Sequence, residues 1–120
     1  MKKIGLIVPY NHTMLSIGAI VDVIETVNRI LVNANKEEPF RITVFQTPQQ
    51  IQHHGNLFHG YPVKSIRSKY QTDIVFIPAL ATGKIEETIA KNKLYLSWLH
   101  RQFDAGAEIA SFCTGAFLFA

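Results

Sequence analysis

The sequence is poor in cysteine and has no long apolar run. Its single cysteine, Cys113, excludes an internal disulfide and predicts a reduced, cytoplasmic setting. No stretch approaches the roughly 20 apolar residues of a membrane-spanning helix. The apolar run Ile4–Val8 near the N-terminus is shorter than the core of a signal peptide, and Pro9 ends it. We therefore expect an intracellular protein with no membrane partner.

The sequence also lacks a large excess of positive or negative charge. The 120 residues include 12 Lys and Arg and 9 Asp and Glu, which gives a net charge of +3 at pH 7. The basic residues are scattered and form no stripe along one element, so this stretch has no electrostatic footprint for DNA. With 48% apolar and 18% charged residues, the composition is typical of one globular domain with a core.

Strand and helix patterns alternate along the chain. Uniformly apolar runs predict strands buried on both faces, and apolar residues three and four apart predict helices. The expected strands are Ile4–Val8, Phe40–Thr47, Asp73–Pro78 and Glu108–Phe112. The expected helices are a segment capped by Ser16, with Ile17, Ile20, Val21, Ile24, Val27 and Leu31 on its apolar face, then Ile85–Ala90, Asn92–Asp104 ended by Gly106, and the residues from Gly115 onward.

Pro48–Lys69 is less regular, and within it the glycines and proline of the string H-H-G-N-L-F-H-G-Y-P predict a short hairpin or edge strand. The whole order predicts an α/β fold with a mainly parallel sheet and helices on both faces, a flavodoxin-like three-layer sandwich. The last predicted helix reaches only from Gly115 to Ala120 and has no polar end. We therefore expect this sandwich to be incomplete at the C-terminus, with residues 1–120 as the N-terminal portion of a longer domain.

The segment Ala110–Ala120, A-S-F-C-T-G-A-F-L-F-A, predicts a sharp turn from strand to helix with Cys113 at its tip. In α/β folds ligands bind beyond the C-terminal ends of the strands, which is where Cys113 falls. A nucleophile elbow strains the backbone of its central residue and needs small neighbours, a role for Gly115. The alternative interpretation is a buried structural cysteine.

Several strings resemble one family over essentially the whole chain. They are C-T-G-A-F-x-x-A with the upstream W-L, I-G-L-I-V-P, G-A-I-V-D-V-I-E-T-V-N and D-I-V-F-I-P. They resemble the class I glutamine amidotransferase-like (PfpI-type) domain, in particular the version fused to an AraC-type DNA-binding domain in bacterial transcriptional regulators. The resemblance implies a sensor and dimerisation domain with a small-molecule effector, a homodimer, and DNA contacts through a helix-turn-helix domain beyond the end of this chain.

Enzymes of this superfamily use the elbow cysteine as nucleophile and place an acidic residue of the first helix near it. The matching residues are Cys113 and Asp22, although Asp22 is equally consistent with a solvated helix residue. The enzymes also need a histidine after the elbow helix, and no histidine of this chain fits that position. Ser111 stands where they have glycine, and Pro78 is followed by Ala79–Ala81 instead of the glycine pair that helps to form an oxyanion hole.

The resemblance thus implies a sensor without enzymatic activity or cofactor. Its expected ligand pocket is lined by Asn11, Asp22, Ala79, Leu80, Cys113 and Thr114. One alternative is a cysteine-dependent hydrolase, either an amidase, a peptidase or a glyoxalase-like enzyme, and another is a redox or electrophile sensor that uses Cys113 alone. His53, His54 and His59 have no Cys, Asp or Glu at ligand spacing, so we predict no metal site.

Overall fold

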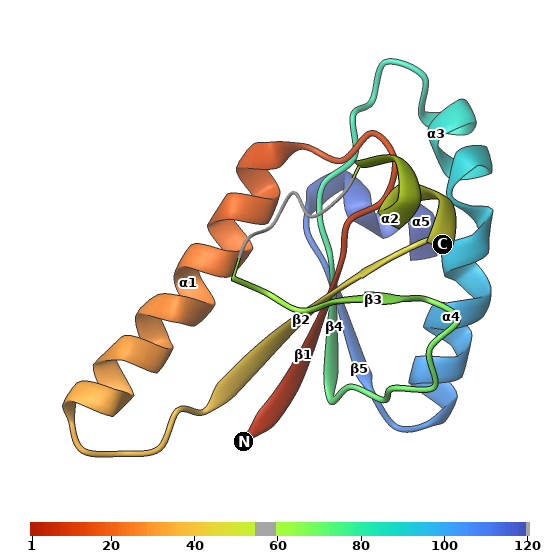
Figure 1. Cartoon of the computed structure of the whole chain (residues 1–120). Coiled ribbons are helices and arrows are strands. Elements are labelled where there is room, and N and C mark those ends of the chain that lie inside the picture. The colour runs from red at the N-terminus through yellow and green to blue at the C-terminus, as the bar shows by residue number, and fades with distance from the viewer. Residues whose placement is uncertain (55–59, 120) are drawn as a thin grey trace.

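A computed structural model describes residues 1–54 and 60–119 of the chain (Figure 1). Within this part, all the strands belong to one sheet in which every neighbouring pair runs parallel. The strands are β1 (Lys2–Ile7), β2 (Phe40–Gln46), β3 (Val63–Ser65), β4 (Ile74–Ile77) and β5 (Glu108–Ser111), in the order β3-β2-β1-β4-β5. The predicted parallel α/β sheet is confirmed.

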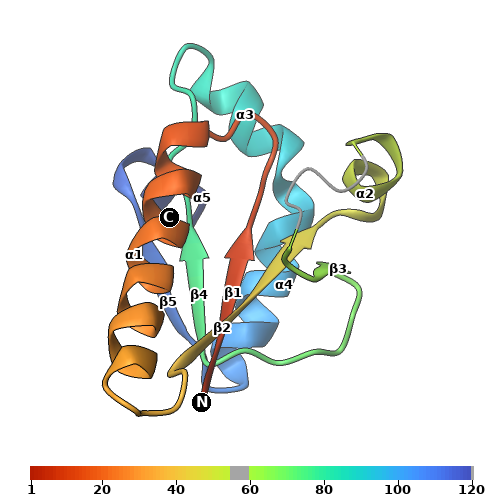
Figure 2. The same ribbon diagram turned by 60° about the vertical axis from the view of Figure 1, so that its left-hand side comes forward.

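Helices cover both faces of this sheet. They are α1 (Met14–Asn33), α2 (Pro48–His54), α3 (Ile85–Lys91), α4 (Lys93–Asp104) and the short α5 (Ala116–Phe119), which comes after a 3₁₀ turn at Cys113–Gly115. Figures 1 and 2 show α1 along one face, with α3 and α4 along the other. The three layers of a flavodoxin-like sandwich are therefore present.

Each face of the sheet carries its own apolar cluster. On one face, α1 buries Ile17, Ile20 and Ile24 against β1 and β2. On the other face, Trp98 of α4 is fully buried and its ring centroid lies 4.7 Å from that of Phe45. Strands buried from both sides explain the uniformly apolar runs in the sequence.

The first helix begins earlier than predicted, and it buries Ile17, Ile20 and Ile24 as predicted but differs at Val27 and Asn28. Its N-cap residue is Thr13, and Ser16 lies inside the first turn, where its hydroxyl donates to the Thr13 carbonyl oxygen at 2.8 Å. The prediction that Val27 faces the core is wrong, because Val27 is exposed and Asn28 is buried instead. The Asn28 side chain donates to the Phe40 carbonyl oxygen at 2.9 Å and accepts from the Phe40 amide at 3.1 Å, which satisfies a buried amide.

Half of the string for which a hairpin or edge strand is predicted, residues 53–62, lies outside the described residues, and an edge strand, β3, follows directly after it. Residues Pro48–His54 form α2, and β3 pairs in parallel with β2 at the sheet edge. Thr47 and Gln50 form a reciprocal cap, because the Gln50 amide donates to Thr47 Oγ1 at 3.2 Å and the Thr47 amide donates to Gln50 Oε1 at 3.3 Å. Residues 55–59, including His59, lie outside the described residues.

Candidate functional site

The candidate site lies where the C-terminal ends of β1, β4 and β5 meet. Because all three strands run parallel, the loop after β1, the loop after β4 and the cysteine turn leave the sheet at the same edge. The chain leaves β1 toward β2 on one side, whereas β4 and β5 lie on the other side of β1. Such a switch point is where ligands bind in open α/β sheets.

The turn at Cys113 has the backbone of an elbow. Cys113 has a φ of 49°, a left-handed conformation that is uncommon for a residue with a side chain, and its side chain is exposed. The Phe112 amide donates to the Ile77 carbonyl oxygen at 2.9 Å, so the turn stays attached to the end of β4. The predicted elbow is confirmed, and the alternative of a buried structural cysteine is wrong.

Gly115 allows this turn to lie against β4. A Cβ atom at Gly115 would lie 2.9 Å from the Ile77 carbonyl oxygen and would clash more severely with the Pro78 carbonyl oxygen. Both obstacles are backbone atoms, which cannot rotate away as a flexible side chain can. Glycine is therefore required here by close packing, in agreement with the need for a small neighbour.

Thr114 connects the elbow to the loop after β4. Its Oγ1 accepts from the Leu80 amide at 2.8 Å and donates to the Leu80 carbonyl oxygen at 2.7 Å. Leu80 is buried, so its two backbone polar groups depend on this one hydroxyl rather than on water. The structure thus brings the predicted residues Thr114 and Leu80 into direct contact.

The neighbouring amides of the same loop also donate hydrogen bonds to acceptors within the protein. The Ala79 amide donates to Ser16 Oγ at 3.1 Å, and the Ala81 amide donates to the Asn11 carbonyl oxygen at 2.8 Å. Together with Leu80, three successive amides already have acceptors inside the protein. An oxyanion hole needs amides that are free to point at the developing negative charge, and these three are not free in this conformation.

Asn11 has a second role at this edge. Its φ is 60°, and its side-chain Nδ2 donates to Thr88 Oγ1 at 3.0 Å. Beside it, the Tyr10 amide donates to Asn92 Oδ1 at 2.8 Å, and Asn92 Nδ2 donates back to the Tyr10 carbonyl oxygen at 3.0 Å. These bonds attach the loop after β1 to α3 and to the junction between α3 and α4.

Two buried residues of this edge, Thr88 and Asn92, were not predicted from the sequence. The only local signal was an asparagine at the boundary between two predicted helices, a position that favours capping residues. Their contacts with the loop after β1 span 77 and 82 residues of sequence.

Asp22 does not join this cluster. It lies on α1 and lines a shallow groove along that helix with Ala19, Val23, Thr26 and Val27. Among the described residues, no hydrogen bond links Asp22 to Cys113. Its role as the acid partner of Cys113 remains a prediction from the family resemblance.

A buried polar network supports the ends of β1 and β2 on the α4 side. The Tyr95 hydroxyl hydrogen-bonds with Gln50 Oε1 and lies 3.2 Å from the Val8 carbonyl oxygen, to which Gln50 Nε2 donates at 2.9 Å. Burial raises the pKa of Tyr95 far above that of a free tyrosine. Tyr95 therefore stays neutral over the physiological pH range and acts as a structural group.

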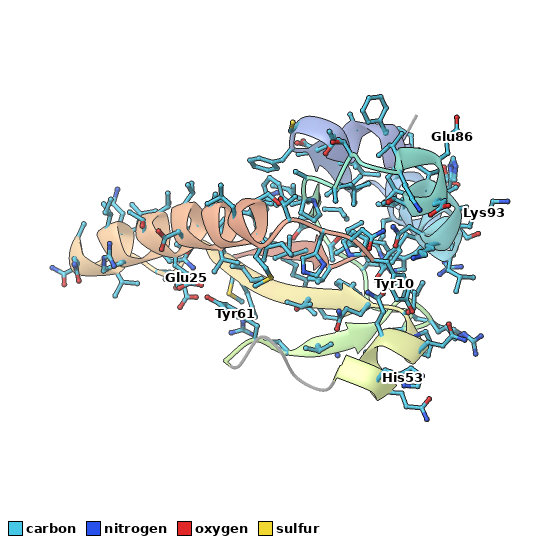
Figure 3. All side chains as sticks on the ribbon, turned by 90° about the horizontal axis from the view of Figure 1, so that it is seen from above. Tyr10, Glu25, His53, Tyr61, Glu86 and Lys93 are labelled. Carbon is cyan, nitrogen blue, oxygen red and sulfur yellow. The ribbon has the colours of Figure 1, made fainter. Side chains whose placement is uncertain are left out.

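A second tyrosine, Tyr61, lies on the β3 side of α1. Figure 3 shows Tyr61 beside Glu25, and partial burial together with this carboxylate raises the pKa of Tyr61. Both residues line a groove next to β2 that also contains Glu38 and Arg41. This groove lies on the opposite side of β1 from the elbow, so it is separate from the candidate site.

The histidines show no metal-binding arrangement in the described part of the chain. His12 hydrogen-bonds through Nδ1 to the Pro9 carbonyl oxygen at 2.7 Å, and His53 is exposed on α2 (Figure 3). His59 and the side chain of His54 lie outside the described residues. Within residues 1–54 and 60–119, no three His, Cys, Asp or Glu side chains come together to hold a metal ion.

The helices of residues 1–54 and 60–119 include none with the length and apolar character to cross a membrane.

Comparison with known proteins finds a likeness of fold but no likeness of sequence. No protein-family model matches the sequence, and no curated protein matches it. The structure resembles the crystal structure of a "putative transcriptional regulator protein" from Vibrio parahaemolyticus, with a TM-score of 0.69 and 17% sequence identity. The match covers 98% of this chain and 59% of the Vibrio chain, so this chain spans about three-fifths of its relative's length. At this identity, the likeness establishes the fold.

Proposed function

We propose that this chain is the sensor and dimerisation portion of an AraC-family transcriptional regulator, cytoplasmic and without enzymatic activity. In this proposal a small-molecule effector binds at the elbow edge, at Asn11, Ala79, Leu80, Cys113 and Thr114, and the predicted contact of Asp22 with the effector would be made from the groove along α1. A helix-turn-helix domain beyond residue 120 binds DNA. The fold shared with the Vibrio protein and the family resemblance of the elbow string both support this proposal.

One observation favours a sensor over an enzyme. The amides of Ala79, Leu80 and Ala81, which come after β4 where the related enzymes have their glycine pair, all donate to acceptors within the protein. Catalysis at Cys113 would require at least one of them to exchange its partner for the oxyanion. Binding requires no such exchange, since a ligand can use the exposed Cys113 edge as it stands.

The homodimer included in this proposal would use the exposed side of α1. Leu15, Val23 and Ile30 are 87%, 64% and 60% exposed, although each is a large apolar side chain. They lie on the outer side of the helix, away from its buried residues. A second copy of the chain, bringing the same stripe, would remove both stripes from water in an isologous contact.

A cysteine-dependent hydrolase is the second candidate, favoured by the exposed Cys113 in its left-handed turn. The two candidates place different requirements on the sequence after residue 120. The regulator requires two helix-turn-helix segments, whereas the hydrolase requires a histidine that can reach the Cys113 sulfur. Reading the coding sequence downstream of residue 120 tests both requirements.

An activity assay provides the second test. The full gene product and its Cys113→Ala variant are incubated with chromogenic ester and amide substrates, and release of the chromophore is monitored. The sensor proposal expects the same background rate for both proteins. A rate that disappears with Cys113→Ala, together with a downstream histidine, would overturn the proposal in favour of the hydrolase.

A further inference from the structure

A pocket lined by basic residues lies between α4 and the segment that connects β3 to β4. It is formed by Arg67, Ser68, Lys69, Gln71, Arg101 and Gln102. Three of these side chains are cationic at neutral pH, and none is a carboxylate. The pocket is separate from the elbow edge. Asn92, the N-cap residue of α4, accepts from the Tyr10 amide at that edge, and Arg101 is nine residues further on, roughly 13 Å along the helix axis.

The walls of this pocket are fixed by hydrogen bonds. Gln102 is 5% exposed, and its Oε1 accepts from the Thr72 amide at 2.9 Å while its Nε2 donates to the Tyr70 carbonyl oxygen at 2.9 Å. Arg101 donates through Nη2 to the Ile66 carbonyl oxygen at 2.9 Å. The segment from Ile66 to Thr72 is therefore held to α4 at both ends before any ligand arrives.

The polar groups that face the pocket retain donors for a ligand. Ser68 Oγ accepts from the Tyr70 amide at 3.2 Å, which leaves its own hydrogen to donate. Among the described residues, the side chains of Arg67 and Lys69 make no hydrogen bond, and the Arg101 guanidinium uses one of its five N–H groups. Donors from three cations and a hydroxyl around one hollow match the oxygens of a tetrahedral anion.

The surrounding charge adds to this preference. The Nζ atoms of Lys3 and Lys64 each lie 5.1 Å from the centroid of the Tyr70 ring, so two further cations lie beside the same segment. The carboxylate of Asp73, at the end of the segment, accepts from the Lys3 amide at 2.7 Å. Five Lys and Arg side chains thus surround a short stretch of a chain whose net charge is only +3.

We propose that this pocket binds a phosphate group, either free phosphate or the phosphate of a small ester. Its guanidinium groups would bind phosphate oxygens in pairs, and the ligand would relieve the mutual repulsion of Arg67, Lys69 and Arg101. This second ligand site is independent of the function proposed for the elbow edge. Loss of one would leave the other intact.

The test measures binding of inorganic phosphate by isothermal titration calorimetry, with sodium chloride added to keep the ionic strength constant. The variant Arg67→Gln/Lys69→Gln removes two cations whose side chains make no hydrogen bond in the described structure, so the fold should be retained. The control Arg29→Gln/Lys36→Gln removes the same charge from the last turns of α1 and from the segment that follows it. We expect binding about fivefold weaker for each pocket charge removed, and unchanged binding for the control.

Two further measurements extend this test. The first distinguishes free phosphate from a phosphate ester as the ligand, and the second uses a single substitution in place of the double variant. Glycerol phosphate is titrated in parallel, and binding that is equal to or tighter than that of inorganic phosphate supports the proposal. Ser68→Ala, a small change at an intermediate-exposure site, is expected to weaken phosphate binding. Equal loss of binding in the control variant, no phosphate binding at constant ionic strength, or binding of a DNA duplex but not of phosphate would each overturn it.

Discussion

Replacing Gly115 with alanine tests whether the elbow depends on close packing against β4. The added Cβ would lie 2.9 Å from the Ile77 carbonyl oxygen and 3.1 Å from Ile77 Cγ2, and it would clash with the Pro78 carbonyl oxygen. Accommodating the methyl group requires the 3₁₀ turn at Cys113–Gly115 to move away from β4. Such movement would also stretch the hydrogen bonds between Thr114 and Leu80.

The cost should be at the upper end of that for overpacking, about 2–3 kcal/mol in the free energy of unfolding. Two of the three obstacles are main-chain oxygens, so rotamer changes cannot relieve the clash. Gly115 does not have a positive φ, and the penalty therefore comes from space and not from backbone conformation. With a urea m-value of about 2 kcal/mol/M, the transition midpoint should fall by roughly 1–1.5 M.

The assay is equilibrium urea unfolding monitored by far-ultraviolet circular dichroism, with Gly18→Ala as the matched control. A Cβ at Gly18, inside α1, would meet no atom within 4 Å. That variant should be stabilised by about 0.5–1 kcal/mol, because alanine favours a helix interior more than glycine does. If Gly115→Ala leaves the midpoint unchanged or raises it, the close-packing explanation for the elbow is wrong.

Three further predictions concern other parts of the molecule. Thr114→Val keeps the side-chain shape but removes the hydroxyl that serves both backbone groups of Leu80, so urea unfolding should show a loss of about 1–3 kcal/mol, with Thr114→Ser close to the parent. Because the pKa of Tyr95 is higher in the folded state, the stability it contributes is present below the unfolded pKa near 10 and is lost above it. Tyr95→Phe should therefore flatten the fall in stability above pH 10. If the proposed homodimer forms through α1, Val23→Ser should weaken self-association about tenfold in sedimentation equilibrium, whereas Arg29→Gln should not.

The sheet and its helices could be predicted from local sequence patterns, such as apolar runs and the spacing of apolar residues. Strands buried on both faces have uniformly apolar sequences, so the positions of β1 and β4 were visible without structural information. The helix α2 was also visible in principle, because Thr47 and Gln50 stand at capping-box spacing with Pro48 between them. The glycines and prolines further along suggested a hairpin and obscured this signal.

Long-range polar contacts could not be predicted in the same way. The Ala79 amide finds its acceptor, Ser16, 63 residues away, and the Leu80 amide finds Thr114 at a distance of 34 residues. Nothing in the sequence near residue 80 specifies these partners, since they depend on where two other segments leave the sheet. The sequence alone indicated the lack of a glycine pair, whereas only the structure gives each amide its acceptor.

The contacts of Gly115 and Thr114 show which features of the elbow are explained by its structure alone. Gly115 is small because the backbone of β4 lies against it, and Thr114 is polar because Leu80 needs a partner. Both residues are thus accounted for by packing and hydrogen bonding, with no reference to the reactivity of the Cys113 sulfur. The left-handed turn therefore fixes the position of Cys113 at an exposed edge, but an elbow of this kind would be retained by a binding protein as readily as by an enzyme. Chemistry at this sulfur depends on groups that the elbow itself does not supply, namely a second free amide for the oxyanion, from another loop, and a histidine within reach of Cys113.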